Sequence, residues 1–188
     1  MANSTVDKII DLAEIQVRAG GYNSFSFREI SKVIGIKSAS IHYHFPTKTD
    51  LGVAVATRYT ERFIDLLQAL SQHKLQSTER LSEYINLFRQ AATRDKKMCL
   101  CGQLASESDV LPEPIKLATK RFFDSNLAWL TTEVFVNAGL DLHTAQQRAA
   151  WLLATMEGAL LMSKVLDHAE IFDSISTDLP RLLSSNPV

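Results

Sequence analysis

The sequence contains only two cysteines, Cys99 and Cys101, among its 188 residues. Thiols this close together cannot cross-link distant parts of a fold, so the disulfide framework of a small secreted domain is excluded. The first residues lack a basic stretch followed by an apolar core, as a secretory signal would have, and we therefore expect a cytoplasmic protein. The longest apolar run, residues 149–162, is shorter than the ~20 residues that cross a bilayer and contains Glu157. No membrane partner is expected.

The chain also lacks an excess of charge of either sign, because 20 basic residues stand against 21 acidic ones. Net charge therefore identifies no partner, and a nucleic-acid-binding protein of this composition needs a local basic patch. We find no nucleophile, metal or phosphate motif and expect neither enzymatic activity nor a cofactor or metal. An all-α enzyme using Cys99 or Cys101 with a histidine is kept as a minor alternative.

No segment alternates apolar and polar residues between turn signals, so no strand is predicted and the expected fold is all-α. Apolar residues instead recur at helical spacing, separated by caps, glycines and prolines. The first predicted helix begins behind Ser4 or Thr5 and ends at Gly20. Further helices are predicted over residues 26–34, 38–45, 47–71, 78–94, 103–110, 113–138 and 144–166, and a broken helix over 171–185.

The two short helices 26–34 and 38–45 have the length and punctuation of a helix-turn-helix. Ser26 stands three residues before Glu29, as in a capping box, and Gly35 supplies the turn. Pro46 ends the second short helix, and Thr47 with Asp50 begins the long helix that follows. The helix of residues 38–45 would be the recognition helix.

Small residues let a recognition helix approach DNA closely, and longer donors reach bases or phosphates. Residues 38–48 contain both kinds, and residues 28–50 carry four lysines or arginines against two carboxylates. The alternative is that Ile41 and Phe45 are core and the rest is a solvated face. The small residues are Ser38, Ala39 and Ser40, and the candidate donors are His42, Tyr43, His44 and Lys48.

The segment "FSFREISKVIGIKSASIHYHFPTKTDLGVAV" closely resembles the N-terminal DNA-binding domain of the TetR/AcrR family of transcriptional regulators, over about the first sixty residues. The resemblance implies a three-helix DNA-binding domain in residues 1–50 and a larger helical effector-binding and dimerisation domain in 51–188. Two positions differ from the family pattern: Ala39 stands where the family often has glycine, and His42 stands where most members have tyrosine. The DNA-binding positions that the resemblance implies are Ser26, Arg28, Lys37, Ser38, Ala39, Ser40, His42, Tyr43, His44 and Lys48.

The segment "AAWLLATMEGALL" is apolar nearly all round, so its helix must be covered on more than one side. Ala154 and Gly158 lie four residues apart on one face, which allows another helix to come close. In the resembling family, the last long helices pair across a homodimer, and we expect the dimer interface here. A central core helix in a monomer is the alternative.

Aromatic and soft side chains gather in the second part of the sequence and suit a mostly apolar small-molecule pocket, although such residues are more often core. Glu107 and Glu157 stand in apolar surroundings, where either could meet a cationic ligand or lie at an exposed rim. The candidate effector-pocket residues are Phe88, Phe122, Phe123, Trp129, Trp151 and Met156.

The motif "MCLCG" offers a second input signal. A cysteine near Arg94, Lys96 or Lys97 could have its thiolate favoured and sense oxidants or electrophiles; the alternative is a buried small hydrophobic residue. We expect a regulator that binds a double-stranded DNA operator as a homodimer, most simply a repressor released by a small molecule. A thiol-based sensor using Cys99 or Cys101 is the alternative.

Overall fold

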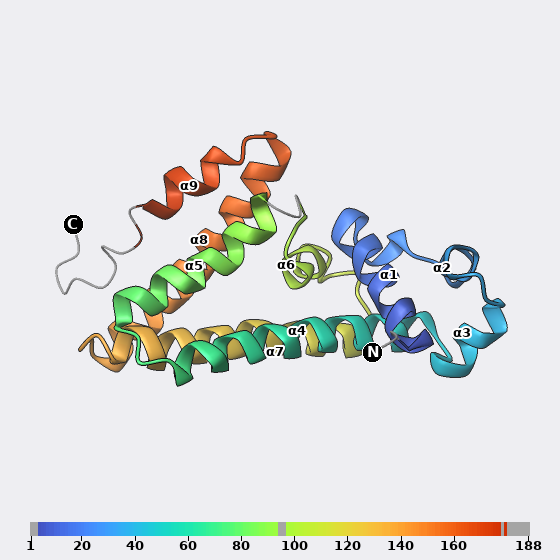
Figure 1. Cartoon of the computed structure of the whole chain (residues 1–188), viewed down its shortest axis with the longest axis horizontal. Coiled ribbons are helices and arrows are strands. Elements are labelled where there is room, and N and C mark those ends of the chain that lie inside the picture. The colour runs from blue at the N-terminus through green and yellow to red at the C-terminus, as the bar shows by residue number, and fades with distance from the viewer. Residues whose placement is uncertain (1–3, 94–96, 178, 180–188) are drawn as a thin grey trace. The chain divides into compact units, whose positions relative to one another are not determined.

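The computed structural model describes residues 4–93, 97–177 and 179, and all regular structure within them is helical (Figure 1). The predicted all-α class is therefore confirmed. None of the described helices is long and apolar enough to cross a membrane. The elements are α1 (Thr5–Gly20), η1 (Tyr22–Ser24), α2 (Phe27–Ile34), α3 (Ser38–His44), α4 (Lys48–Gln72), α5 (Ser77–Thr93), α6 (Leu100–Ala105), α7 (Glu113–Trp129), η2 (Leu130–Val136), α8 (Leu142–Val165) and α9 (Glu170–Thr177).

The helices divide into two compact units, and α4 and α7 each run from one unit into the other. Unit 1 consists of residues 1–61 and 100–122, so α6 and the first part of α7 pack with α1 to α3. Its core is one apolar cluster, to which α1 contributes Ile9, Ala13 and Val17 and the segment 100–115 contributes Leu104 and Ile115. Unit 2 consists of residues 62–99 and 123–188, and in it α8 packs against α5, η2 and α9.

Local capping explains where the first helices begin. Ser4 and Asp7 form a full capping box at α1. At α4, the Thr47 hydroxyl accepts the Asp50 backbone N–H at 3.1 Å, while an Asp50 carboxylate oxygen accepts the Thr47 N–H at 2.9 Å. Such reciprocal bonds satisfy backbone donors that have no partner within the helix. The predicted starts of these helices are confirmed.

The predicted helix at 103–110 is wrong, because α6 spans Leu100–Ala105 and the chain then turns. Leu100, Cys101 and Leu104 are buried, so the apolar face lies nearly one turn earlier than predicted. The Ser106 hydroxyl donates to the Gln103 carbonyl at 2.7 Å. This local side-chain bond competes with helix continuation.

The predicted helix 113–138 is regular only as far as Trp129, and its last part is the π-helical η2. The Asn137 N–H donates to the Thr132 carbonyl, five residues earlier, at 3.3 Å. The Thr132 hydroxyl also donates to the Ala128 carbonyl at 3.0 Å. The widening therefore occurs where a hydroxyl engages the backbone ladder. Residue 94 of the predicted fifth helix and residues 178 and 180–185 of the predicted last one lie outside the described residues.

Candidate functional site

In unit 1, α2 and α3 are held by a cap, a glycine turn and two buried side chains. The Ser26 hydroxyl accepts the Glu29 N–H at 3.2 Å and caps α2. Gly35 has a φ of 73°, a left-handed conformation that glycine adopts without strain and that ends α2. Ile41 and Phe45 are buried and fix α3 on the core of unit 1. The geometry is that of a helix-turn-helix.

The remaining face of α3 and its N-cap Lys37 is available to a partner. Tyr43 is 84% exposed, the largest exposed fraction among the large hydrophobic side chains of the described chain. Its ring meets His44 edge to face, with centroids 5.1 Å apart. Ser38 is half-buried because its hydroxyl lies 3.1 Å from that of Ser31 on α2. The exposed predicted residues are Arg28, Lys37, Ala39, Ser40, His42, Tyr43 and His44.

His42, which replaces the tyrosine common in the resembling family, is positioned by two contacts. Its ring packs edge to face on Phe27 of α2, with centroids 4.7 Å apart. Its Nδ1 lies 3.3 Å from the Pro46 carbonyl, a distance at which a protonated Nδ1 donates a hydrogen bond. The ring is thus oriented by α2 and by the chain after α3.

Lys48, the first residue of α4, lies beside two aromatic rings. Its Nζ is 4.8 Å from the ring centroid of Tyr22 and 4.7 Å from that of Phe25. Partial burial lowers the pKa of this ammonium, and the negative charge of Glu107 partly offsets that effect. Cation–π contacts of this kind hold an ammonium in place. No sequence motif pointed to the roles of Tyr22 and Phe25.

Glu107, a predicted ligand or rim residue, instead binds the backbone of unit 1. Its carboxylate accepts the Tyr22 N–H at 3.0 Å. Gly21 has a φ of 82°, and a Cβ placed there would lie 1.6 Å from Oε1 of Glu107. Only glycine therefore fits this approach, which ties the loop after α6 to the turn that carries Tyr22.

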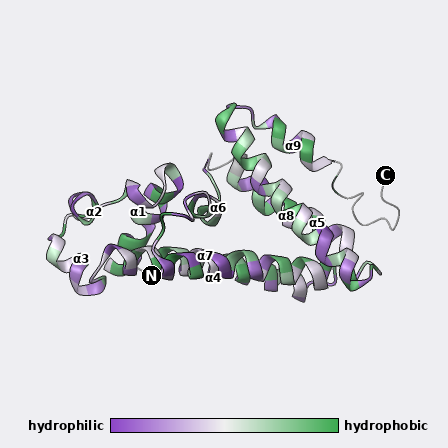
Figure 2. Ribbon diagram, turned by 180° about the vertical axis from the view of Figure 1, so that it is seen from behind, coloured by the Kyte–Doolittle hydropathy of each residue, from purple (hydrophilic) through white to green (hydrophobic). Residues whose placement is uncertain are grey.

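In unit 2, the predicted interface residues Ala154 and Gly158 lie on an exposed stripe along α8. Trp151 is 52% exposed, Leu161 53% and Val165 74%, and their spacing of three or four residues puts them on the same face. A Cβ added at Gly158 meets no atom within 4 Å. Figure 2 shows hydrophobic colour over much of α9 and the adjoining end of α8. We call Trp151, Ala154, Gly158, Leu161 and Val165 the α8 stripe.

Some of the predicted effector residues meet in unit 2 around Tyr84, which the sequence did not single out. Tyr84 stacks on Trp129, with centroids 5.8 Å apart and planes at 18°, and also contacts Phe88 at 5.4 Å. Its hydroxyl donates to Oδ1 of Asn126 at 2.8 Å. We call Tyr84, Phe88, Trp129 and Phe63 the aromatic cluster; Phe63 lies 5.8 Å from Phe88.

The other predicted effector residues are placed differently. Phe122 packs against Tyr59 within unit 1, with ring centroids 5.8 Å apart. Trp151 belongs to the exposed α8 stripe. Met156 is fully buried on the opposite side of α8, and Phe123 is half-buried.

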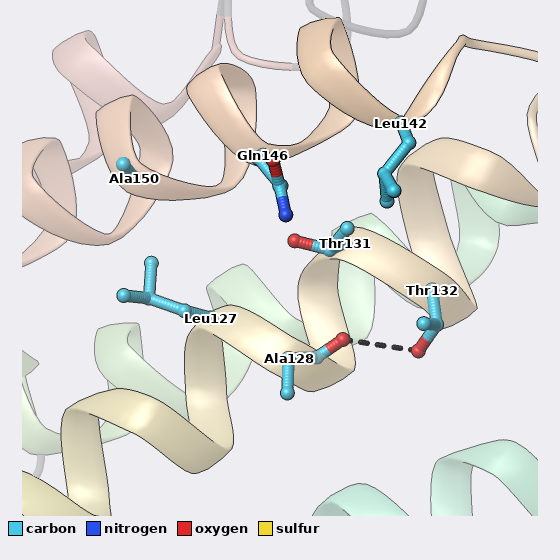
Figure 3. A pocket seen from close by; sticks show the side chains of 7 residues that line it. All are labelled: Leu127, Ala128, Thr131, Thr132, Leu142, Gln146 and Ala150. Carbon is cyan, nitrogen blue, oxygen red and sulfur yellow. Dashed lines mark hydrogen bonds between the residues drawn. The ribbon is translucent and has the colours of Figure 1, made fainter.

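An open groove of about 400 Å³ lies elsewhere in unit 2, between the end of α7 with η2 and the start of α8 (Figure 3). Leu127 and Thr131 approach it from one side, and Leu142, Gln146 and Ala150 approach from the other. None of the predicted effector residues lines this groove.

Among the described carboxyl groups, that of Glu157 on α8 has the largest shift in pKa. Both carboxylate oxygens are buried without a hydrogen-bond partner in the described chain. Burial raises the pKa of Glu157 to about 7, and the Cys99 thiol, a weak donor, acts in the opposite direction. The charge of Glu157 in turn raises the pKa of Tyr84, after the larger effect of burial. Glu157 therefore interacts electrostatically with both Cys99 and Tyr84.

Both cysteines are buried and free of disulfides. Cys101 lies 3.9 Å from the Thr60 hydroxyl in unit 1, whereas Cys99 belongs to unit 2. Of the basic residues predicted to activate a thiolate, Arg94 and Lys96 lie outside the described residues, and Lys97 is half-buried. The burial resembles that of small hydrophobic side chains more than that of reactive thiols.

Two family models match the chain. Residues 9–55 match "Bacterial regulatory proteins, tetR family", and residues 77–178 match "Transcriptional regulator LmrA/YxaF-like, C-terminal domain". Among curated proteins, the negative transcriptional regulator IcaR of the biofilm operon icaADBC of Staphylococcus aureus is 24% identical over 143 residues, which cover 70% of this chain and 76% of that protein.

Solved structures agree with these matches. A TetR transcriptional regulator from Legionella pneumophila is 32% identical, with a TM-score of 0.93 over 98% of this chain and 100% of that one. A TetR-family regulator from Agrobacterium tumefaciens is also 32% identical, with a TM-score of 0.88 over 94% and 95% of the two chains. With a helix-turn-helix in unit 1 and likeness over nearly its whole length, the chain belongs to the TetR family of bacterial transcriptional regulators.

Proposed function

We propose that the chain is a dimeric repressor that inserts α3 into the major groove of an operator and is released by a small molecule bound in unit 2. The exposed face of α3 carries this proposal. Ile41 and Phe45 anchor the helix, while Tyr43 and the neighbouring His42 and His44 are exposed. A solvated structural helix has no need of such a strongly exposed tyrosine, whereas a DNA-binding helix needs donors and flat rings on that side.

The residues divide into two kinds of contact. Lys37, Ser38 and Ser40, at the start of α3, are suited to base edges and neighbouring phosphates, because the first turn of a recognition helix enters the groove. Tyr43 and His44 are suited to the sugar-phosphate backbone, and the ring of His42 is held against Phe27 of α2. Ser26, Arg28 and Lys48 bind phosphates and supply affinity without base preference. Ala39 allows close approach.

The α8 stripe provides the dimer interface in this proposal. A row of exposed apolar side chains is costly in water and is relieved when a second copy covers it. Ala154 and Gly158 leave room for the partner helix. A two-fold dimer presents two α3 helices to half-sites about one DNA turn apart.

Two observations support repression of transcription and release from DNA by a small molecule. The name of the Staphylococcus aureus relative describes a negative regulator. The aromatic cluster of unit 2 offers apolar surface for an effector, and an effector releases DNA when it prefers the non-binding conformation. Both thiols are buried, which favours a small-molecule signal over thiol chemistry.

Selection from a random duplex library tests the proposal. The wild-type protein should enrich a two-fold symmetric site, and Tyr43→Ala should bind that site at least about fivefold more weakly, as expected for loss of a contact of ~1 kcal/mol. Leu117→Ala, which removes an exposed side chain from α7, is the matched control and should bind normally. Enrichment of no sequence, or equal binding by Tyr43→Ala, would contradict the role of α3.

A further inference from the structure

The Glu157 carboxylate lies in unit 2 without the partners that a buried charge requires. No N–H or O–H group in the described chain donates to either oxygen, and each oxygen has almost no contact with solvent. Burying an unpaired carboxylate is costly, so such groups are normally paired, hydrogen-bonded or protonated. Glu107, the other acidic residue in apolar surroundings, differs because it accepts the Tyr22 N–H.

The two side chains that interact electrostatically with Glu157 cannot supply the donors that it lacks. Cys99 offers only a weakly donating thiol. The Tyr84 hydroxyl, which feels the charge of Glu157, already donates its proton to Asn126 at 2.8 Å. The carboxylate thus has an unfilled requirement for donors and for positive charge.

The same Tyr84 belongs to the aromatic cluster, where its ring stacks on Trp129. The Trp129 indole N–H is also satisfied, because it donates to the Ser71 hydroxyl at 2.8 Å. Tyr84 and Phe88 are buried in this apolar cluster, and the polar groups of Tyr84 and Trp129 are already paired. Aromatic faces attract cations, and the attraction adds to that of a nearby carboxylate.

We propose that Glu157 and the aromatic cluster form a subsite for an effector that joins a protonated amine to an apolar body. The amine donates hydrogen bonds to the Glu157 oxygens and neutralises their charge, and the apolar body lies against Tyr84, Trp129 and Phe88. A neutral alcohol supplies one donor and leaves the charge unpaired, while an anionic ligand adds a second negative charge. This inference rests on the proposed function in taking unit 2 as the effector domain.

Three probes with the same phenylbutyl body test the subsite: phenylbutylamine, phenylbutanol and phenylbutyrate. Their affinities for the full-length protein are measured by isothermal titration calorimetry without DNA. The variant is Glu157→Gln, which keeps the size of the side chain and removes its charge. The matched control is Glu83→Gln, the same change at an exposed residue of α5.

The wild type and Glu83→Gln should bind the amine at least about tenfold more tightly than the alcohol, because charge-assisted hydrogen bonds are stronger than hydrogen bonds between neutral groups. The butyrate should bind more weakly than the alcohol. In Glu157→Gln, the preference for the amine should fall to about twofold or less while alcohol binding persists. An amine preference unchanged by Glu157→Gln, equal binding of amine and alcohol by the wild type, or no binding of the amine would each overturn the proposal.

A second measurement separates this inference from the proposed function. Release of the selected DNA site is followed by fluorescence anisotropy with the same probes. Amine binding through Glu157 without DNA release would keep the subsite and contradict the proposed release mechanism. Release by phenylbutanol, with no preference for the amine, would keep the ligand-released repressor and overturn the subsite.

Discussion

The ammonium of Lys48 lies over the rings of Tyr22 and Phe25 at the first turn of α4, next to the exposed face of α3. A side chain held in this way is placed to bind a phosphate with little further loss of freedom. Lys48→Met keeps an apolar chain of similar length against the rings and removes the charge. It should weaken binding to all DNA sequences alike and reduce the slope of log affinity against log salt by about one.

Salt titrations by fluorescence anisotropy check this prediction, with Lys74→Met as the control, because Lys74 is exposed in the link between α4 and α5. A Lys48→Met protein that changes base preference but retains the wild-type salt slope would show that Lys48 contacts bases instead.

The raised pKa of Glu157 predicts how the free energy of unfolding depends on pH. Its pKa rises from an ordinary 4.5 to about 7 on folding, so between these values the folded state binds more protons than the unfolded state. Stability from this group is fully present below pH 4.5 and is lost as the pH rises through 7. The difference corresponds to about 3 kcal/mol. Glu157→Gln should therefore become more stable relative to the wild type across this range, and level off above it.

Urea denaturation at fixed protein concentration, from pH 4.5 to 8, measures the difference between the two proteins, in which the other titrating groups largely cancel. Glu83→Gln should show no such trend, because that side chain is exposed. A constant difference between Glu157→Gln and the wild type would mean that the carboxyl group is not buried without partners.

Helix α8 has two apolar faces, one covered within the protomer and one exposed. One face, with Leu152, Met156 and Ala159, is buried within unit 2, and the other is the α8 stripe. Gly158→Leu fills open space in the single chain, so the protomer should keep its fold. The leucine should hold a partner helix away and yield monomers.

Sedimentation velocity with circular dichroism tests this outcome, and Leu142→Ala, at an exposed residue of the first turn of α8, serves as a control expected to remain dimeric. A dimer of unchanged strength in Gly158→Leu would move the interface away from the stripe.

Sequence signals predicted elements well wherever the signal was local. Ser4, Ser26, Thr47 and Gly35 lie at the caps and turn where they were predicted. The position of α6 was missed because it depends on which face of residues 100–104 meets unit 1, a long-range fact. Tyr84 was missed for the same reason: only folding brings its ring to Trp129, 45 residues away in the sequence. The π-helical turn has no simple sequence signature.

The sequence predicted the parts of the candidate site that depend on residue spacing within one helix. It did not predict the parts that depend on contacts between distant residues. The exposed residues of α3 follow from a short helix with Ile41 and Phe45 on its inner side. The environments of Lys48, Glu107 and Glu157 were not predictable, because each is set by residues distant in the chain. Glu107 and Glu157 carry the same charge in similar apolar sequence, yet one binds a backbone N–H and the other has none.

In the complete dimer, two-fold symmetry connects the DNA-binding face of α3 with the α8 stripe. One copy of α3 reads only a few base pairs, and an affinity sufficient for an operator needs a second copy at a fixed distance. DNA recognition through α3 should therefore be lost when dimerisation through α8 is lost, although the two surfaces belong to different units.

Hydroxyl-radical footprinting on the selected site measures this coupling most directly. The account predicts two protected patches about one helical turn apart for the wild type, and loss of both patches for Gly158→Leu at the same protein concentration. A footprint confined to one half-site for the wild type, or an undiminished two-patch footprint from a monomeric Gly158→Leu protein, would contradict the account.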